Sequence, residues 1–190
     1  NIINITSSIG ISIFPDNATD SSTLFSIADN MMYRVKSQGR NMIGIPTEDD
    51  VAGMFKGMGE KSIIITRALA EKSIIPYFQP VMNLKTGDVE SNELLMRIPL
   101  NDNSIMNAGE FIEMAENMGV INELDYILME KTFKIMSEVN YQGLIFINLS
   151  PKILIIKDFM HKVNTLTSRY GIDIGKIVFE NLSYHFSRFS

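Results

Sequence analysis

The chain has 190 residues, a formal net charge of −5 and 45% hydrophobic residues, a balance that excludes a disordered or collagen-like protein. It has no cysteine, which excludes disulfides, zinc–thiolate sites and a cysteine nucleophile. No apolar run reaches the ~18–20 residues of a membrane span, and no signal-peptide pattern is visible. Because Lys and Arg form no basic stripe, duplex nucleic acid is not an expected partner. We expect a cytoplasmic protein, and the sequence leaves open whether a membrane anchor precedes Asn1.

The first region, residues 1–45, predicts two strands that flank a helix. Ser8–Phe14 alternates apolar and small residues and ends in a turn at Pro15. Asp20 offers an N-cap, apolar residues then recur at helical spacing, and Gly39 ends the helix. Asn41–Ile45 predicts the second strand.

Residues 46–73 predict a helical connector and mark the domain boundary. Three glycines, Gly53, Gly57 and Gly59, weaken its first half, which we therefore expect to be flexible. Its second half continues as a helix with mixed apolar and charged positions.

Residues 74–190 predict an α/β region with a parallel sheet. Pro76–Leu84 predicts an extended segment broken by Pro80, and Lys85–Asp88 predicts a hairpin turn that leads into a strand at Val89–Ile98. The remaining elements alternate, as parallel α/β units do; they are helices at 108–118, 121–135 and 151–170, and buried strands at 144–149 and 177–179.

Three polar residues lie at the ends of the buried strands: Glu93, Asn148 and Glu180. The carboxyl ends of parallel strands lie at one edge of a sheet. The side-chain oxygens of these three residues are hard ligands, which suit Mg²⁺ or Mn²⁺. Arg97 shares a strand face with Glu93, and a cation beside such a site suits a phosphate ester.

Each of these residues also has a structural explanation. Glu93 suits a charged hairpin edge, Asn148 suits a helix cap or turn, and Glu180 suits a solvated strand end. Arg97 could pair with any surface acid. The pattern alone therefore indicates a candidate divalent-metal site in an α/β domain.

Five segments of the second region, taken in order, resemble the EAL domain family. They are Tyr77-Phe78-Gln79-Pro80-Val81, Glu93-Leu94-Leu95-Met96-Arg97, Phe111-Ile112 with Ala115-Glu116 and Gly119, Asn148-Leu149-Ser150-Pro151, and Val178-Phe179-Glu180. The first region resembles the C-terminal third of a GGDEF domain, on Ser8-Ile9-Gly10-Ile11, Ala28-Asp29, Tyr33, Lys36 and Gly39-Arg40-Asn41. The resemblance implies a partial TIM-like (β/α) barrel of EAL type over 74–190, preceded by a GGDEF α/β remnant over 1–45.

The resemblance also implies a function, the hydrolysis of cyclic di-GMP to the linear dinucleotide with two Mg²⁺ or Mn²⁺ ions. Glu93, Asn148 and Glu180 match ligands of the first metal, and Glu93 is the predicted catalytic residue. Arg97 and Gln79 match residues of the dinucleotide site. Lys36 and Arg40 match residues that hold GTP phosphates in GGDEF domains, although they also suit a solvated helix end.

Three functions stay open at this point. The first is a phosphodiesterase, the second is a degenerate EAL module that binds cyclic di-GMP or a protein partner, and the third is a diguanylate cyclase. The family usually has Thr and a second Glu where this chain has Ser183 and Tyr184. The downstream half of the barrel, with its Asp-Asp pair, is not in this sequence. We therefore expect these residues alone to be inactive and to aggregate, to pair edges with a second copy as a homodimer, or to melt non-cooperatively.

Overall fold

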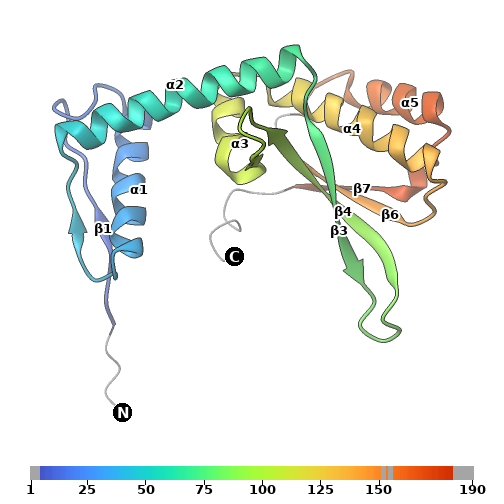
Figure 1. The fold of residues 1–190 in the computed structure, drawn as a ribbon, viewed down its shortest axis with the longest axis horizontal. Coiled ribbons are helices and arrows are strands. Elements are labelled where there is room, and N and C mark those ends of the chain that lie inside the picture. Colours follow the sequence, from blue (N-terminus) through green and yellow to red (C-terminus); the bar gives the residue numbers. More distant parts are fainter. Residues whose placement is uncertain (1–4, 151–152, 154–155, 182–190) are drawn as a thin grey trace. The chain divides into compact units, whose positions relative to one another are not determined.

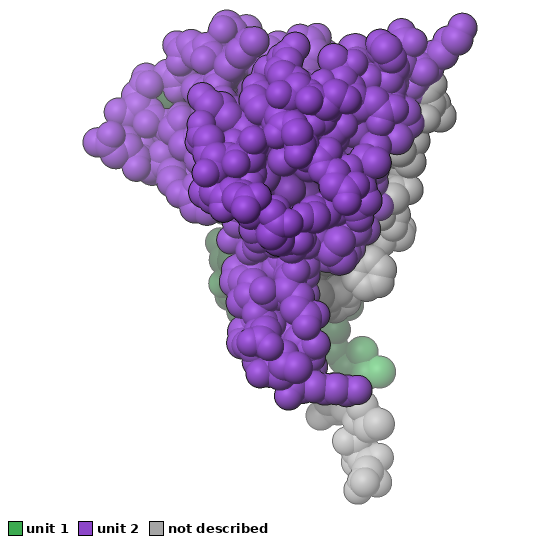
Figure 2. All heavy atoms as spheres, turned by 90° about the vertical axis from the view of Figure 1, so that its right-hand side faces the viewer, with its two compact units in different colours: residues 1–60 green, residues 61–190 purple. Residues whose placement is uncertain are grey.

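The computed structural model describes residues 5–150, 153 and 156–181. The chain divides into two compact units, residues 1–60 and residues 61–190 (Figure 2). The predicted division into 1–45, 46–73 and 74–190 stays a prediction. Among the described residues, no helix is both long and apolar enough to cross a membrane.

Unit 1 places one helix against two short parallel strands. Strand β1 (Ile9–Gly10) pairs with β2 (Ile43–Gly44), and helix α1 covers Ser21–Ser37. The Asp20 side chain accepts a hydrogen bond from the Thr23 backbone N–H at 2.8 Å, which confirms the predicted N-cap. Both strands are shorter than predicted, since only two residues of each pair with the other strand.

Helix α2 (Glu48–Ala70) begins in unit 1 and ends in unit 2. Its start is capped reciprocally: the Asp50 carboxylate accepts from the Thr47 backbone N–H at 2.9 Å, and the Thr47 hydroxyl accepts from the Asp50 backbone N–H at 3.2 Å. Arg34 of α1 forms an ion pair with Asp50. The three glycines of the first half all lie within the helix, so they do not interrupt it.

Unit 2 is built on a mixed sheet with the strand order β3-β4-β6-β7, with β5 paired to β4. The antiparallel pairing of β3 with β4 confirms the predicted hairpin, and the parallel pairing of β4, β6 and β7 confirms the predicted α/β pattern. The strands are β3 (Ile75–Met82), β4 (Val89–Pro99), β5 (Ile105–Asn107), β6 (Leu144–Leu149) and β7 (Ile177–Asn181). The sequence patterns did not predict β5.

The predicted break at Pro80 is wrong, because β3 continues through it in register with Asn92. Strand β3 pairs on only one side within the described sheet. An edge strand can point the nitrogen of a proline away from the ladder, where a missing N–H costs no hydrogen bond.

Besides the end of α2, unit 2 contains α3 (Ala108–Asn117), α4 (Ile121–Glu138) and α5 (Phe159–Tyr170). Helix α5 covers most of the segment 151–170 that is predicted to be mostly helical; residues 156–158 are not helical, and residues 151, 152, 154 and 155 lie outside the described part. A short 3₁₀ helix, Ile174–Lys176, stands where Gly175 predicted a break. Helices α4 and α5 lie on the same side of the sheet (Figure 1).

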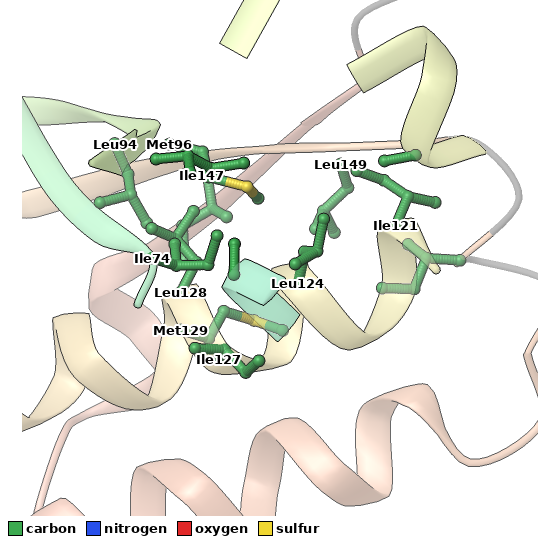
Figure 3. Packing of buried hydrophobic residues seen from close by; sticks show 14 of the residues in the cluster. Ile74, Leu94, Met96, Ile121, Leu124, Ile127, Leu128, Met129, Ile147 and Leu149 are labelled. Carbon is green, nitrogen blue, oxygen red and sulfur yellow. The ribbon is translucent and has the colours of Figure 1, made fainter. Parts of the chain in front are cut away.

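The core of unit 2 lies between these helices and the sheet. Leu94, Met96 and Ile147 of the sheet meet Leu124 and Leu128 of α4 (Figure 3), and all five side chains are buried. On β4 and β6 these buried residues alternate with half-buried ones. The sheet therefore has one face in the core and a second face that carries the polar residues of interest.

Candidate functional site

The strand register places the predicted site residues on one face of the sheet. Gln79 of β3 pairs with Glu93 of β4, and Asn148 of β6 pairs with Glu180 of β7. Glu93 pairs with Phe146, which lies two residues before Asn148 on the same strand. Because paired residues share a face and alternate residues along a strand share a face, all of them lie opposite the core face.

A direct side-chain contact joins two of the predicted metal ligands. The Asn148 Nδ2 donates a hydrogen bond to Glu93 Oε1 at 2.7 Å. The other amide atom, Asn148 Oδ1, is buried and has no hydrogen-bond partner. An unpartnered buried oxygen carries a desolvation cost that a cation or a donor would remove. The Asn148–Glu93 pair therefore presents an unpartnered oxygen acceptor, Asn148 Oδ1, on the polar face of the sheet.

These residues fit part of a divalent-metal shell. The Asn148 and Glu93 oxygens and the adjacent Glu180 carboxylate are hard ligands of the kind that Mg²⁺ and Mn²⁺ take. In the part of the chain that the structure describes, no three His, Cys, Asp or Glu residues are grouped so that they could hold a metal ion. The strand register shows only that Glu93, Asn148 and Glu180 share a face. Their roles as metal ligands stay predictions.

Arg97 lies on the same face, since it is four residues beyond Glu93 on β4. Its Nη1 donates to the Met96 carbonyl at 2.9 Å, and its Cζ lies 5.4 Å from the centre of the Tyr77 ring. No local sequence pattern singles out Tyr77 by itself. The contact runs diagonally across two strands, so it depends on a register that sequence patterns do not give.

The GGDEF-like residues Lys36 and Arg40 are both exposed near the end of α1. Gly39 and Arg40 both have positive φ angles, of 117° and 64°, so the chain leaves the helix before Arg40. The two side chains are therefore not successive positions of one helical face. Their predicted contact with GTP phosphates stays a prediction.

Asp125 of α4 is a buried acid that sequence analysis missed. It is 5% exposed, and its Oδ2 has no hydrogen-bond partner. Burial, and secondarily the charge of Glu116, raise the pKa of Asp125 to about 7. Its position in the helical pattern of α4 looked polar and gave no sign of burial. Because α4 packs on the core face, Asp125 does not belong to the polar face that carries Glu93.

Comparison with known families assigns the second region to a family. The EAL domain family model matches residues 64–183, which is more than half of the chain. The chain belongs to the EAL domain family. The family model described as "Diguanylate cyclase, GGDEF domain" matches residues 1–42, so the order of the two segments is the predicted one.

Known proteins similar to this chain are longer than it. It is 24% identical over 173 residues to the signaling protein YkoW of Bacillus subtilis (strain 168), and the match covers 87% of the chain and 21% of YkoW. It is 27% identical over 114 residues to the cyclic di-GMP phosphodiesterase PdeR of Escherichia coli (strain K12), over 60% of the chain and 17% of PdeR. The chain thus spans less than a third of the length of these relatives.

Solved structures show the same fold. The FimX EAL domain from Pseudomonas aeruginosa bound to c-di-GMP matches with a TM-score of 0.58 and 23% identity, over 65% of this chain and 50% of that one. The match confirms a mixed α/β fold that forms part of a TIM-like barrel of EAL type, and the GGDEF remnant precedes it. Half of the matched EAL chain has no counterpart in these residues.

Proposed function

We propose that this chain supplies the first half of an EAL unit that hydrolyses cyclic di-GMP to the linear dinucleotide. The observation that carries the proposal is the Asn148–Glu93 hydrogen bond of 2.7 Å beside a buried, unpartnered Asn148 Oδ1. The relatives support it: PdeR is a cyclic di-GMP phosphodiesterase, and the matched FimX EAL domain is bound to c-di-GMP.

Each residue on the polar face then has a role. Glu93, Asn148 and Glu180 would hold one Mg²⁺ or Mn²⁺ ion, which would make a water more acidic and offset negative charge on phosphate oxygens. The hydrogen bond from Asn148 fixes the Glu93 carboxylate, so that one of its oxygens stays oriented before the ion arrives. Arg97 and Gln79, on the same face, bind the dinucleotide, with the Arg97 guanidinium directed at a phosphate.

The reaction breaks one of the two phosphodiester bonds of the ring. A water oxygen forms a bond to phosphorus, the bond from phosphorus to the ribose oxygen breaks, and that oxygen takes up a proton. A general arrangement for this displacement uses two ions. The residues named here provide for one, so we expect the second ion to bind residues outside the described part.

The alternative function is a module that binds cyclic di-GMP without cleaving it. The observation in its favour is the departure from the family pattern at Ser183 and Tyr184, which lie outside the described residues. Both functions need the dinucleotide to bind near Arg97, and only the first needs turnover. Binding and hydrolysis therefore have to be measured separately.

The test is Glu93→Gln in the whole protein that carries this chain. We expect hydrolysis with Mg²⁺ or Mn²⁺ to fall by at least about 100-fold, since losing residues that merely support ligands already costs 10–100-fold. Mn²⁺ binding, measured by electron paramagnetic resonance, should weaken in parallel. A wild-type rate in the Glu93→Gln protein would contradict the role of Glu93.

The matched control is Glu90→Gln on the same strand. The Glu90 side chain is exposed and accepts a hydrogen bond from Asn83 Nδ2 at 3.0 Å, which a glutamine oxygen can also accept. We expect this variant to keep the wild-type rate. A wild-type protein that binds cyclic di-GMP but shows no turnover would support the binding module instead.

The chain of 190 residues by itself provides a second test. We propose that it has no measurable phosphodiesterase activity, because its polar face provides ligands for only part of a two-ion site. A monodisperse monomer of these residues that turned over cyclic di-GMP would contradict this.

A further inference from the structure

The polar face contains an aromatic residue, Tyr77, whose ring lies against the Arg97 guanidinium. Tyr77 is on β3 and pairs with Leu95, whereas Arg97 pairs with Ile75. The two side chains are thus diagonal neighbours on adjacent strands, a spacing that long and aromatic side chains can bridge. The distance of 5.4 Å from Cζ to the ring centre lies within the range of a cation–π interaction.

The contact displaces the charge of Arg97 along the sheet. Leu95, the partner of Tyr77, lies one residue beyond Leu94, and Asn148 lies one residue beyond Ile147, the partner of Leu94. Tyr77 and Asn148 are therefore at the same level of the sheet, and Glu180 pairs with Asn148. The backbone of Arg97 is two residues farther along, so contact with the Tyr77 ring draws the guanidinium toward the level of Asn148 and Glu180.

Arg97 keeps most of its donors available in this position. One Nη1 donor is used by the Met96 carbonyl at 2.9 Å. Among the residues that the structure describes, Arg97 forms no ion pair with a carboxylate. A guanidinium has five N–H donors, and a phosphate accepts two of them in parallel. The contact with the Tyr77 ring consumes none of these donors.

We propose that Tyr77 is a positioning residue that holds the Arg97 guanidinium at the level of Asn148 and Glu180, where it meets a phosphate of the dinucleotide. The inference rests on the proposed function of this face. It assigns to Tyr77 no contact with the reacting atoms. The ring face carries the effect, so phenylalanine can replace tyrosine at this position and leucine cannot.

The experiment compares Tyr77→Leu with Tyr77→Phe in the whole protein. The readouts are the Kd for cyclic di-GMP, measured by titration calorimetry, and the separate values of kcat and KM. We expect Tyr77→Leu to raise Kd and KM about two- to fivefold with kcat changed by less than about twofold, the range of a half-exposed cation–π contact. Tyr77→Phe should restore the wild-type values.

Two controls isolate the route through Arg97. Phe78→Leu makes the same kind of change on the same strand but on the opposite face, beside Leu94, and should leave Kd unchanged. In an Arg97→Ala background, Tyr77→Leu should have no further effect on Kd, because the group that it positions is absent.

The outcomes separate this inference from the function on which it rests. If the wild-type protein binds cyclic di-GMP and Tyr77→Leu binds it equally well, the role of Tyr77 is refuted and the proposed function stands. An effect of Tyr77→Leu that persists in the Arg97→Ala background also refutes it. A wild-type protein that binds no cyclic di-GMP overturns the proposed function and the inference together.

Discussion

The two units of this chain achieve packing in different ways. In unit 1, the described buried apolar side chains are Ile27, Met31 and Val35, all on α1. In unit 2, a cluster from three strands and four helices is buried, and Phe111 and Phe133 within it are fully covered. Unit 1 therefore gains less stability than unit 2 from burying side chains, and another feature has to hold α1 against the strands.

That other feature is close approach of the backbone. A Cβ added at Gly10 would lie 1.8 Å from the Ala28 carbonyl oxygen of α1, and one added at Gly44 would lie 2.9 Å from the Met31 carbonyl oxygen. Both strands thus contact the helix through positions that only glycine fits. The Ser12 hydroxyl adds a hydrogen bond to the Leu24 carbonyl at 2.8 Å. The comparison teaches that unit 1 should be sensitive to added atoms and unit 2 to removed ones.

The largest effect that we predict is from Gly10→Ala in unit 1. The new methyl group would overlap a backbone oxygen that no rotamer change can move, so strand β1 has to separate from α1. We expect the amides of α1 to lose their protection in hydrogen exchange measured by mass spectrometry, while the amides of α4 keep theirs.

Gly53→Ala is the matched control, because nothing lies within 4 Å of the added Cβ. Gly53 is within helix α2, where alanine is favoured over glycine by up to about 1 kcal/mol, so this variant should be at least as stable as the wild type. Equal protection of α1 in the Gly10→Ala and Gly53→Ala proteins would refute the idea that close approach holds unit 1.

The second prediction is a cavity in unit 2. Phe133 of α4 is 0% exposed, and Phe133→Ala should lower the free energy of unfolding of this unit by about 3–5 kcal/mol. This loss of stability can be measured by unfolding the whole protein in urea and monitoring the hydrogen-exchange protection of the α4 amides. Phe25→Ala in unit 1, where the side chain is 71% exposed, is the control and should change stability little.

The sequence predicted the elements whose causes are local. The N-cap Asp20, the hairpin turn before Val89 and the apolar strand at Leu144–Leu149 all lie where their residues indicate. The wrong or missing predictions depend on partners far away in the chain. Pro80 fits a strand because of its edge position, and Tyr77 acquires a partner only through the register of β3 with β4.

The candidate site shows the same division. The spacing of Glu93 and Arg97 on one strand predicts a shared face, and β4 has it. The hydrogen bond between Asn148 and Glu93 joins residues 55 positions apart, so no local pattern could give it. Asp125 was missed because its burial depends on what packs over α4, and an acid in a helix is more often exposed.

The remaining effect that we predict is the pH dependence that Asp125 gives to unit 2. Burial raises the pKa of this carboxyl from 3.8 to about 7 in the folded chain. Between these values the folded chain keeps a proton that the unfolded chain releases, so the contribution of Asp125 to stability decreases as pH rises from about 4 to about 7. Asp125→Asn removes the titration. We expect its stability relative to the wild type to increase over this range and to level off above pH 7, measured by urea unfolding at pH 4.5, 6 and 8.

The control for that titration is Asp102, whose pKa is shifted in the opposite direction. Hydrogen bonds from the side chain and then the backbone of Ser104 lower the pKa of Asp102, which is exposed. The contribution of Asp102 to stability is present above pH 4 and is lost at lower pH, when the carboxyl is protonated. Asp102→Asn should therefore be less stable than the wild type at neutral pH by a small margin that disappears in acid.

The prediction for Asp125 fails if the difference in unfolding free energy between Asp125→Asn and the wild type is the same at pH 4.5 and at pH 8. In that case the buried carboxyl would not be neutral in the folded chain. Its unpartnered Oδ2 would then have to be explained by a group that stabilises the charge.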